Sequence, residues 1–241
     1  MDKILEHTEH FTLTPGSFDR YSNITPYAVF DIFQEVAAQH ANILDANFNK
    51  TNSEFFWLLI RSKYEIIKPI TKPIKVIVKT WPLKPERIDY EREYQVFDLD
   101  NNLLIKGSSK WCIYDSVKNT ISRETFHFSG SYLNLRNFDQ PLKKIKPLPL
   151  EELEHVYNYK VMPSFLDINN HVNNAKYSIM VLDALNLSKN ESIKTIEFNF
   201  NKELKLNDIV SIYKKKIENT YFVYGYLNNV LHFASKVEVT K

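Results

Sequence analysis

The densest cluster of polar side chains in the chain is segment 167–174, which directly precedes an apolar segment with helical spacing. Asp167, Asn169 and His171 alternate in it, so an extended backbone would place a carboxylate, an amide and an imidazole on one face. An imidazole changes charge near neutral pH and can act as a general base. The N-terminus of the following helix would offer N–H groups to an oxyanion formed at an attacked carbonyl group. The segment therefore predicts chemistry at a carbonyl group, although Asn and Asp also favour loops and helix caps for structural reasons alone.

The elements that must position this segment follow the same order in both halves of the chain. In the first half, Thr25 is a favourable N-cap, Pro26 a favourable first helical residue, and apolar spacing predicts a helix to about Leu44. Alternating and β-branched residues then predict antiparallel strands at 55–67, 74–83, 87–100 and 103–115. In the second half, we expect extended chain at 157–174, a helix at 175–187, and strand-like segments at 193–204, 208–218 and 220–239.

Three sequence anchors, matched in the same order, indicate an internal duplication. The aligned segments are 18–25 with 166–173, 68–70 with 202–204, and 101–108 with 228–235. The polar residues of the second copy are replaced in the first: Asn169 by Tyr21, His171 by Asn23, and Glu203 by Pro69. We therefore expect two copies of one fold, of which only the second retains catalytic residue types.

A helix followed by a strongly curved antiparallel sheet is a hotdog unit, so the predicted class is α+β, a tandem (double) hotdog with two sheets joined edge to edge. The N-terminal unit is predicted to span residues 1–140 and the C-terminal, catalytic unit residues 141–241. Three prolines and several lysines mark residues 125–155 as the linker region. Sites in such proteins form at the seam between two units.

Composition excludes several other classes of protein. The chain has 241 residues and four glycines that are far apart, so it has no Gly-rich loop to hold a phosphate group. Cys112, the single cysteine, is expected to be buried and unreactive, and it can form neither an internal disulfide nor a multi-thiolate zinc site. A net charge of +2 argues against nucleic acid, and no apolar run is long enough to insert in a membrane. With no apolar signal segment visible, a cytoplasmic location is expected.

Six other histidines belong to no comparable polar cluster, and we expect them to be structural or exposed. They are His7, His10, His40, His127, His155 and His232.

The sequence resembles the bacterial acyl-acyl carrier protein thioesterases over nearly its whole length. The matching motifs are Thr25-Pro26, 33–41, 57–61, Thr80-Trp81, 108–111 and, most specifically, 167–177. The resemblance implies a double hotdog that cleaves the thioester between a fatty acyl chain and the phosphopantetheine arm of acyl carrier protein, without a cofactor of its own. It also implies that Asp167, Asn169 and His171 are catalytic and that Glu203 completes the site. Plant members often have a cysteine where this chain has Leu204, so hydrolysis is expected to proceed through water or a carboxylate.

In the expected mechanism, His171 takes a proton from water that Glu203 helps to position. Asp167 either orients the imidazole or attacks the carbonyl carbon itself. The acyl chain would lie inside the first unit. Exposed lysines would bind the acidic carrier protein. The candidates for this contact are Lys143, Lys144, Lys146 and Lys214–Lys216.

Several alternatives remain at the level of the sequence. The expected assembly is a monomer that mimics a hotdog dimer, and a homodimer is the other assembly that the sequence allows. Other candidate functions are a hotdog acyl-CoA thioesterase and, less favoured, a non-catalytic module that binds acyl chains or the carrier. A dehydratase is less favoured because the spacing of histidine and acidic residues that it needs is not seen.

Overall fold

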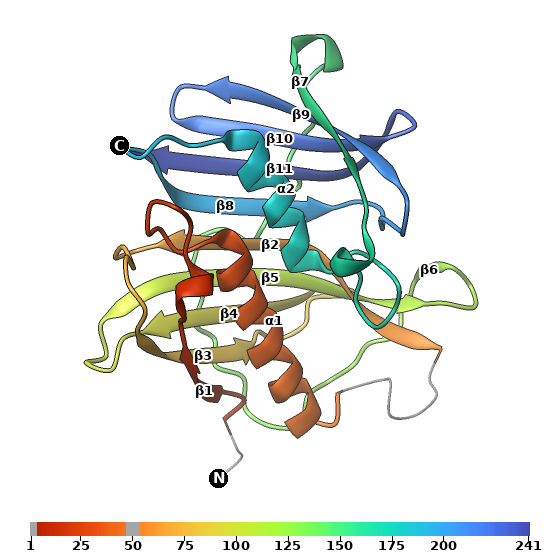
Figure 1. Ribbon diagram of the computed structural model, residues 1–241. Helices are drawn as coiled ribbons and strands as arrows, with labels where there is room; N and C mark the ends of the chain where they lie inside the picture. Colours follow the sequence, from red (N-terminus) through yellow and green to blue (C-terminus); the bar gives the residue numbers. More distant parts are fainter. Residues whose placement is uncertain (1–3, 47–53) are drawn as a thin grey trace.

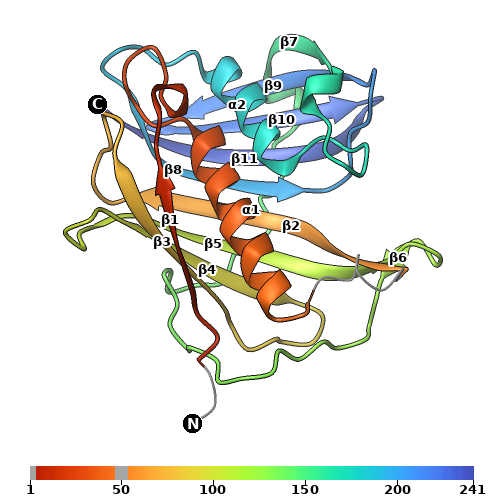
Figure 2. The ribbon, with the colours of Figure 1, turned by 60° about the horizontal axis from the view of Figure 1, so that its bottom comes forward.

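The computed structural model describes residues 4–46 and 54–241, and its strands form one antiparallel sheet with both long helices on the same face (Figures 1 and 2). The first half contains β1 (His7–Thr12), α1 (Pro26–Ile43), β2 (Phe55–Ile66), β3 (Lys75–Pro82), β4 (Tyr90–Phe97), β5 (Leu103–Asp115) and β6 (Thr120–Ile121). The second half contains β7 (Glu154–Lys160), α2 (Tyr177–Leu185), β8 (Ser192–Phe200), β9 (Ile209–Ile217), β10 (Thr220–Leu227) and β11 (Val230–Thr240). Within these described ranges, no helix combines the length and apolar character needed to cross a membrane.

The order of strands repeats about the centre of the sheet. It runs β1-β3-β4-β5-β2-β8-β11-β10-β9-β7, with β6 beside β5. Thus β1, α1 and β2–β5 correspond in order to β7, α2 and β8–β11, and the two halves meet where β2 pairs with β8. This arrangement confirms the predicted double hotdog fold, whereas the exact unit boundaries at 140 and 141 stay a prediction.

Backbone hydrogen bonds define which residues of the two halves are equivalent. Lys68 N–H donates to the carbonyl of Leu104, and Lys202 N–H donates to the carbonyl of His232. The alignment of the last anchor is therefore wrong by one residue, because it places Leu104 opposite Leu231. The cause is a difference in hairpin length: residues 98–102 separate the paired Phe97 and Leu103, whereas only 227–230 separate Tyr226 and Leu231.

Helix α1 begins and packs as its sequence predicts. The Thr25 hydroxyl accepts a hydrogen bond from Ala28 N–H at 3.2 Å, and Pro26 occupies the first helical position. Phe33, on its buried face, stacks on Tyr94 of β4 with ring centroids 4.3 Å apart. It fits there because Gly107 of β5 has no side chain; a Cβ atom at that position would lie 2.2 Å from the Phe33 ring. This contact sets how closely the helix approaches the sheet.

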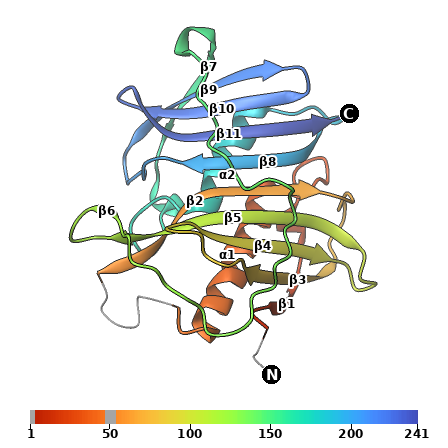
Figure 3. The same cartoon turned by 180° about the vertical axis from the view of Figure 1, so that it is seen from behind.

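The segment between the two halves crosses the face of the sheet opposite the helices, as Figure 3 shows in green. We call residues 122–149 the strap. Ile145 N–H donates to the Asn199 side chain of β8, and Arg61 of β2 donates to the Leu142 carbonyl at 3.1 Å. The predicted linker is therefore an ordered cover that bonds to strands on both sides of the seam.

The strap also buries a carboxylate. Glu93 of β4 is 1% exposed and accepts hydrogen bonds from Asn137 N–H (2.9 Å) and the Ser108 hydroxyl (3.0 Å). Burial raises its pKa to about 7, although these two bonds oppose the shift. A carboxyl group that is easily protonated thus lies between strap and sheet.

We predict that Glu93→Gln removes part of the pH dependence of stability. Between the ordinary pKa of 4.5 and about 7, the folded protein holds a proton that the unfolded chain has released. The contribution of Glu93 to the free energy of unfolding is therefore fully present below pH 4.5, and it declines by about 3 kcal/mol as the pH rises through 7. Urea unfolding at pH 5 and pH 8 measures this, with the exposed Glu151→Gln as control. An equal decline in wild type and Glu93→Gln would contradict the assignment.

Candidate active site

Segment 167–171 forms a tight turn, so the predicted extended strand is wrong. Asp167 Oδ1 accepts hydrogen bonds from Asn169 N–H (2.8 Å) and His171 N–H (3.3 Å). Asn170 completes the turn with φ of 61°. An aspartate that binds the amides two and four residues ahead offers the backbone an alternative to strand pairing. The alternating side chains therefore do not share one face.

The same turn occurs in the first unit. Asp19 Oδ1 accepts hydrogen bonds from Tyr21 N–H (2.8 Å) and Asn23 N–H (2.9 Å), and Ser22 has φ of 66°. The first unit keeps Asp19 although Asn23 stands at the position of His171. Shaping the turn is therefore one role of Asp167. Its Oδ1 serves the backbone, so Oδ2 is the oxygen left for chemistry.

The structure brings His171 and Glu203 together from segments distant in sequence. His171 Nε2 lies 3.1 Å from Glu203 Oε2, and the two side chains are 31% and 38% exposed. Val172 N–H donates to the Leu204 carbonyl at 2.9 Å, which aligns the two segments beside the pair. The carboxylate that reaches the imidazole is thus that of Glu203. The pair can share a proton while remaining accessible to a substrate.

Asn169 lies at the edge of a cavity of about 320 Å³ in the first unit. Most of the cavity lies between α1 and the sheet, and its lining is largely alanine and aromatic residues. These are Ala37, Ala38, Ala41, Ala46, Trp57, Tyr90, Trp111 and Phe128. Gln34 of α1, which also lines the cavity, donates to Asn173 Oδ1 at 3.1 Å. Asn169 of the turn in one unit therefore meets a largely apolar cavity in the other.

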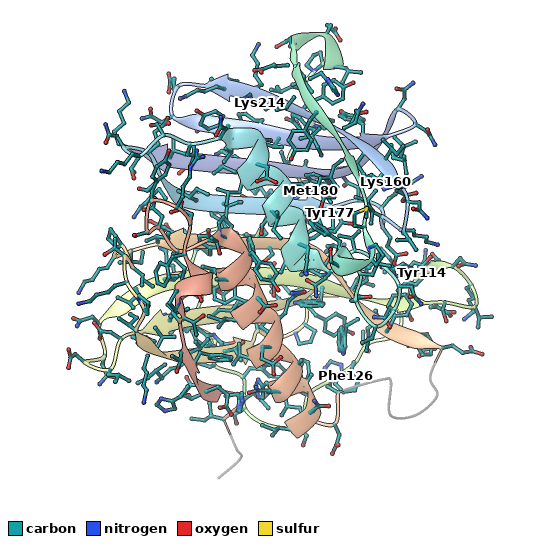
Figure 4. All side chains as sticks on the ribbon, in the orientation of Figure 1. Tyr114, Phe126, Lys160, Tyr177, Met180 and Lys214 are labelled. Carbon is teal, nitrogen blue, oxygen red and sulfur yellow. The ribbon has the colours of Figure 1, made fainter. Side chains whose placement is uncertain are left out.

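The start of the second helical segment differs from the simple helix predicted there. Asn173 is an N-cap whose Oδ1 accepts Ala175 N–H at 2.9 Å, but it caps a 3-10 turn, Asn174–Lys176, before α2 begins. Tyr177, the first residue of α2, is labelled in Figure 4. Its hydroxyl accepts Leu204 N–H at 3.2 Å.

The equivalent place in the first unit contains a cavity of about 260 Å³ but different chemistry. Asn23 and Pro69, which line it, replace the imidazole and the second carboxylate. Its wall is largely aliphatic and includes Ile193 of β8 and Leu182 of α2. Of these two related positions, the one in the second unit therefore pairs an imidazole with a carboxylate.

Sequence reasoning missed three residues that contact the site: Gln34, Tyr177 and His232. His232, expected to be structural or exposed, is buried, and its Nδ1 lies 3.0 Å from the carbonyl oxygen of Glu203. Its contact depends on pairing between distant segments, for which the sequence contains no local signal.

Cys112 is buried as predicted, and burial raises its pKa to about 11. In residues 4–46 and 54–241, no three His, Cys, Asp or Glu side chains are grouped as metal ligands would be.

Fold and site together define a double hotdog protein with an acid–base pair, His171 and Glu203, in its second unit. A family model for the acyl-ACP thioesterase N-terminal domain matches residues 5–127, and one for the acyl-ACP thioesterase C-terminal domain matches residues 150–234. The chain therefore belongs to the acyl-ACP thioesterase family.

Known proteins of this kind resemble the chain in sequence and in fold. It is 23% identical over 230 residues to the chloroplastic oleoyl-acyl carrier protein thioesterase 2 of Arabidopsis thaliana, covering 87% of this chain and 63% of that protein. The chain thus spans less than two thirds of the length of this relative. A 12:0-ACP thioesterase from Umbellularia californica superposes with a TM-score of 0.85 at 14% identity, covering 98% of this chain and 97% of that one. An acyl-ACP thioesterase from Bacteroides thetaiotaomicron superposes with a TM-score of 0.80 at 23% sequence identity, covering 98% of each chain.

The two copies of the turn provide a matched test of Asp167. Asp167→Asn keeps an oxygen acceptor for the two amides, so we expect a free energy of unfolding within about 1 kcal/mol of wild type. Loss of the carboxylate is expected to lower kcat for thioester hydrolysis by about 10²-fold or more. Asp19→Asn makes the same exchange in the first unit and should leave kcat unchanged. Wild-type kcat in Asp167→Asn would mean that this carboxylate only shapes the turn.

Proposed function

We propose that this protein hydrolyses fatty acyl-acyl carrier protein to free fatty acid and carrier protein, the reaction that ends fatty acid synthesis. The observation that carries the proposal is the 3.1 Å contact between His171 and Glu203, made from a turn whose Asn169 lines a largely apolar cavity. A thioester at this position would have its carbonyl beside acid–base groups and its acyl chain beside apolar walls. Membership of the acyl-ACP thioesterase family agrees with this substrate.

In the proposed mechanism, water attacks the thioester carbonyl carbon while His171 accepts its proton. Glu203, at Nε2, stabilises the imidazolium that results, so Nδ1 is the atom that accepts the proton. The Asn169 amide binds the oxyanion. The backbone N–H groups of Ala175 and Lys176 already donate to Asn173, so they are not the donors. Collapse of the intermediate breaks the C–S bond, and His171 returns the proton to the departing thiol. A general base of this kind contributes about 10²–10⁴-fold.

Asp167 allows a second version of the first step. Its Oδ2 attacks the carbonyl carbon, the C–S bond breaks, and the departing thiolate takes a proton from the His171 imidazolium. Water then hydrolyses the anhydride that remains, and His171 takes up the proton that this water releases. In both versions the products are a fatty acid and a thiol, and neither version uses Leu204, whose side chain is fully buried. Water or a carboxylate therefore takes the place of a thiol nucleophile. The phosphopantetheine arm belongs to the substrate, and the protein needs no cofactor of its own for these steps.

The carrier protein is proposed to dock beside Glu203. Of the lysines considered from sequence, Lys214, Lys215 and Lys216 on β9 pair with glutamates at 3.4–3.8 Å, and Lys214 also donates to the Ala184 carbonyl (Figure 4). Lys143, Lys144 and Lys146 lie on the strap, across the sheet from the helices (Figure 3). The exposed Lys202 and Lys205 flank Glu203 instead. These two lysines are better placed to attract an acidic carrier.

A single chain is proposed to be sufficient, because β2 and β8 already join two hotdog units. The proposed location is the cytoplasm, in keeping with a lone, free Cys112.

Hydrolysis of a panel of substrates tests the function. We expect release of fatty acid from acyl carrier protein loaded with chains of different length, with slower turnover of the matching acyl-CoA and a decline as salt is added. His171→Ala should lower kcat by orders of magnitude while thermal unfolding changes little, because the side chain is partly exposed. Faster acyl-CoA hydrolysis would favour a CoA thioesterase. Retention of intact acyl carrier protein without release of fatty acid would indicate a binding module.

The position of the acyl chain can be tested with a substitution in the cavity wall. Ala41 lies seven residues beyond Gln34 on α1, which is about 10 Å along the helix. We expect Ala41→Phe to narrow the cavity and to lower kcat/KM for long chains, with little change for short ones. The short chains serve as the internal control. A uniform loss, or no loss, across the chain lengths would place the acyl chain elsewhere.

A further inference from the structure

His232 is buried on β11 and contacts the segment that presents Glu203. It is 8% exposed, and its Nδ1 atom lies 3.0 Å from the Glu203 carbonyl oxygen. A carbonyl oxygen can only accept, so Nδ1 carries the hydrogen and donates it. Burial also lowers the pKa of His232, which favours the neutral imidazole. The contact is therefore a hydrogen bond from a neutral ring to the backbone.

The peptide group between Glu203 and Leu204 is held at both ends by side chains. Its carbonyl accepts the His232 ring, and its N–H donates to the Tyr177 hydroxyl at 3.2 Å. The backbone carbonyl of His232 also accepts Asn201 N–H (2.8 Å) and Lys202 N–H (3.1 Å). His232 thus bonds both to the N–H of Lys202, which precedes Glu203, and to the carbonyl group of Glu203 itself.

A β-bulge gives His232 this position. Gly225 pairs with Phe233 and Tyr226 with Leu231, which leaves His232 as the extra residue on β11. Bulges redirect a side chain away from the regular alternation of a strand. The bulge therefore explains how one residue uses both its carbonyl and its ring on the same neighbouring segment.

The first unit has the same bulge without the imidazole. Its extra residue is Leu104, whose carbonyl accepts Ile67 N–H (2.8 Å) and Lys68 N–H (3.1 Å). Leu104 has no side-chain donor, and the residue equivalent to Glu203 is Pro69. The backbone anchor is therefore common to the fold, whereas the bond from the ring accompanies the catalytic carboxylate.

We propose that His232 is a positioning residue that holds the Glu203 backbone, and through it the carboxylate, within hydrogen-bonding distance of His171. The proposal rests on the proposed function, because it assigns a catalytic role to Glu203. His232 touches neither the substrate nor the reacting atoms and acts through Glu203.

Two substitutions and a double-mutant cycle test this role. His232→Leu installs the residue of the first unit, and we expect kcat to fall by about 10- to 100-fold with KM nearly unchanged. His232→Asn restores an N–H near the position of Nδ1 and should recover most of kcat. In a Glu203→Gln background, His232→Leu should cause little further loss, because its effect passes through that carboxylate.

The readouts separate this proposal from a purely structural role. Thermal unfolding controls for stability, and should His232→Leu fail to fold, Tyr177→Phe removes the contact at the other end of the same peptide group. The role is overturned if His232→Leu keeps wild-type kcat, or if its effect is the same with and without the Glu203 carboxylate. Lack of hydrolysis by the wild-type protein would instead overturn the proposed function.

Discussion

The pairing of β2 with β8 is the interaction on which the rest of the structure depends. Residues 61–65 and 195–199 form an antiparallel ladder that joins two small sheets into one. Phe30 of α1 contacts both strands, with ring centroids 5.1 Å from Tyr64 and 5.6 Å from Phe198. This seam places the first helix beside the second unit, so that Gln34 reaches Asn173. A largely apolar cavity in one unit can therefore meet Asn169 of the other, in the same turn as His171.

Duplication separates the requirements of the fold from those of the chemistry. Both units keep the aspartate-bound turn, a capped helical segment and the bulge on the last strand, because each satisfies backbone hydrogen bonds that any hotdog unit must make. The units differ in side chains that the backbone does not need: Asn169, His171, Glu203 and His232 in the second, and Tyr21, Asn23, Pro69 and Leu104 in the first. Side chains at such positions can change without loss of the fold, which allows one site to be kept and the other to lose its chemistry.

Much of this arrangement could be predicted from local pattern. Helical spacing gives α1 within one residue of its observed end, and alternation gives the central strands. Predictions failed where side chains bond to nearby backbone or where distant segments pair. The extended strand through Asn169 is a turn because Asp167 binds the amides ahead of it. The last anchor is displaced by one residue because the two hairpins differ in length. Similarly, the strap looked like a linker because its contacts are with strands far away in sequence.

The sequence by itself determined the two-unit plan and the residue types that distinguish the second unit, since periodicity and internal alignment are local properties of the chain. Only the tertiary structure decided that Glu203, rather than Asp167, contacts the imidazole of His171, and that His232 bonds to the backbone of Glu203. Both contacts join residues about 30 positions apart, and the second involves the bulge at His232. Both depend on the register of the strands. Register is set by the whole sheet and by hairpin length, so the pattern of any single segment is insufficient to specify it.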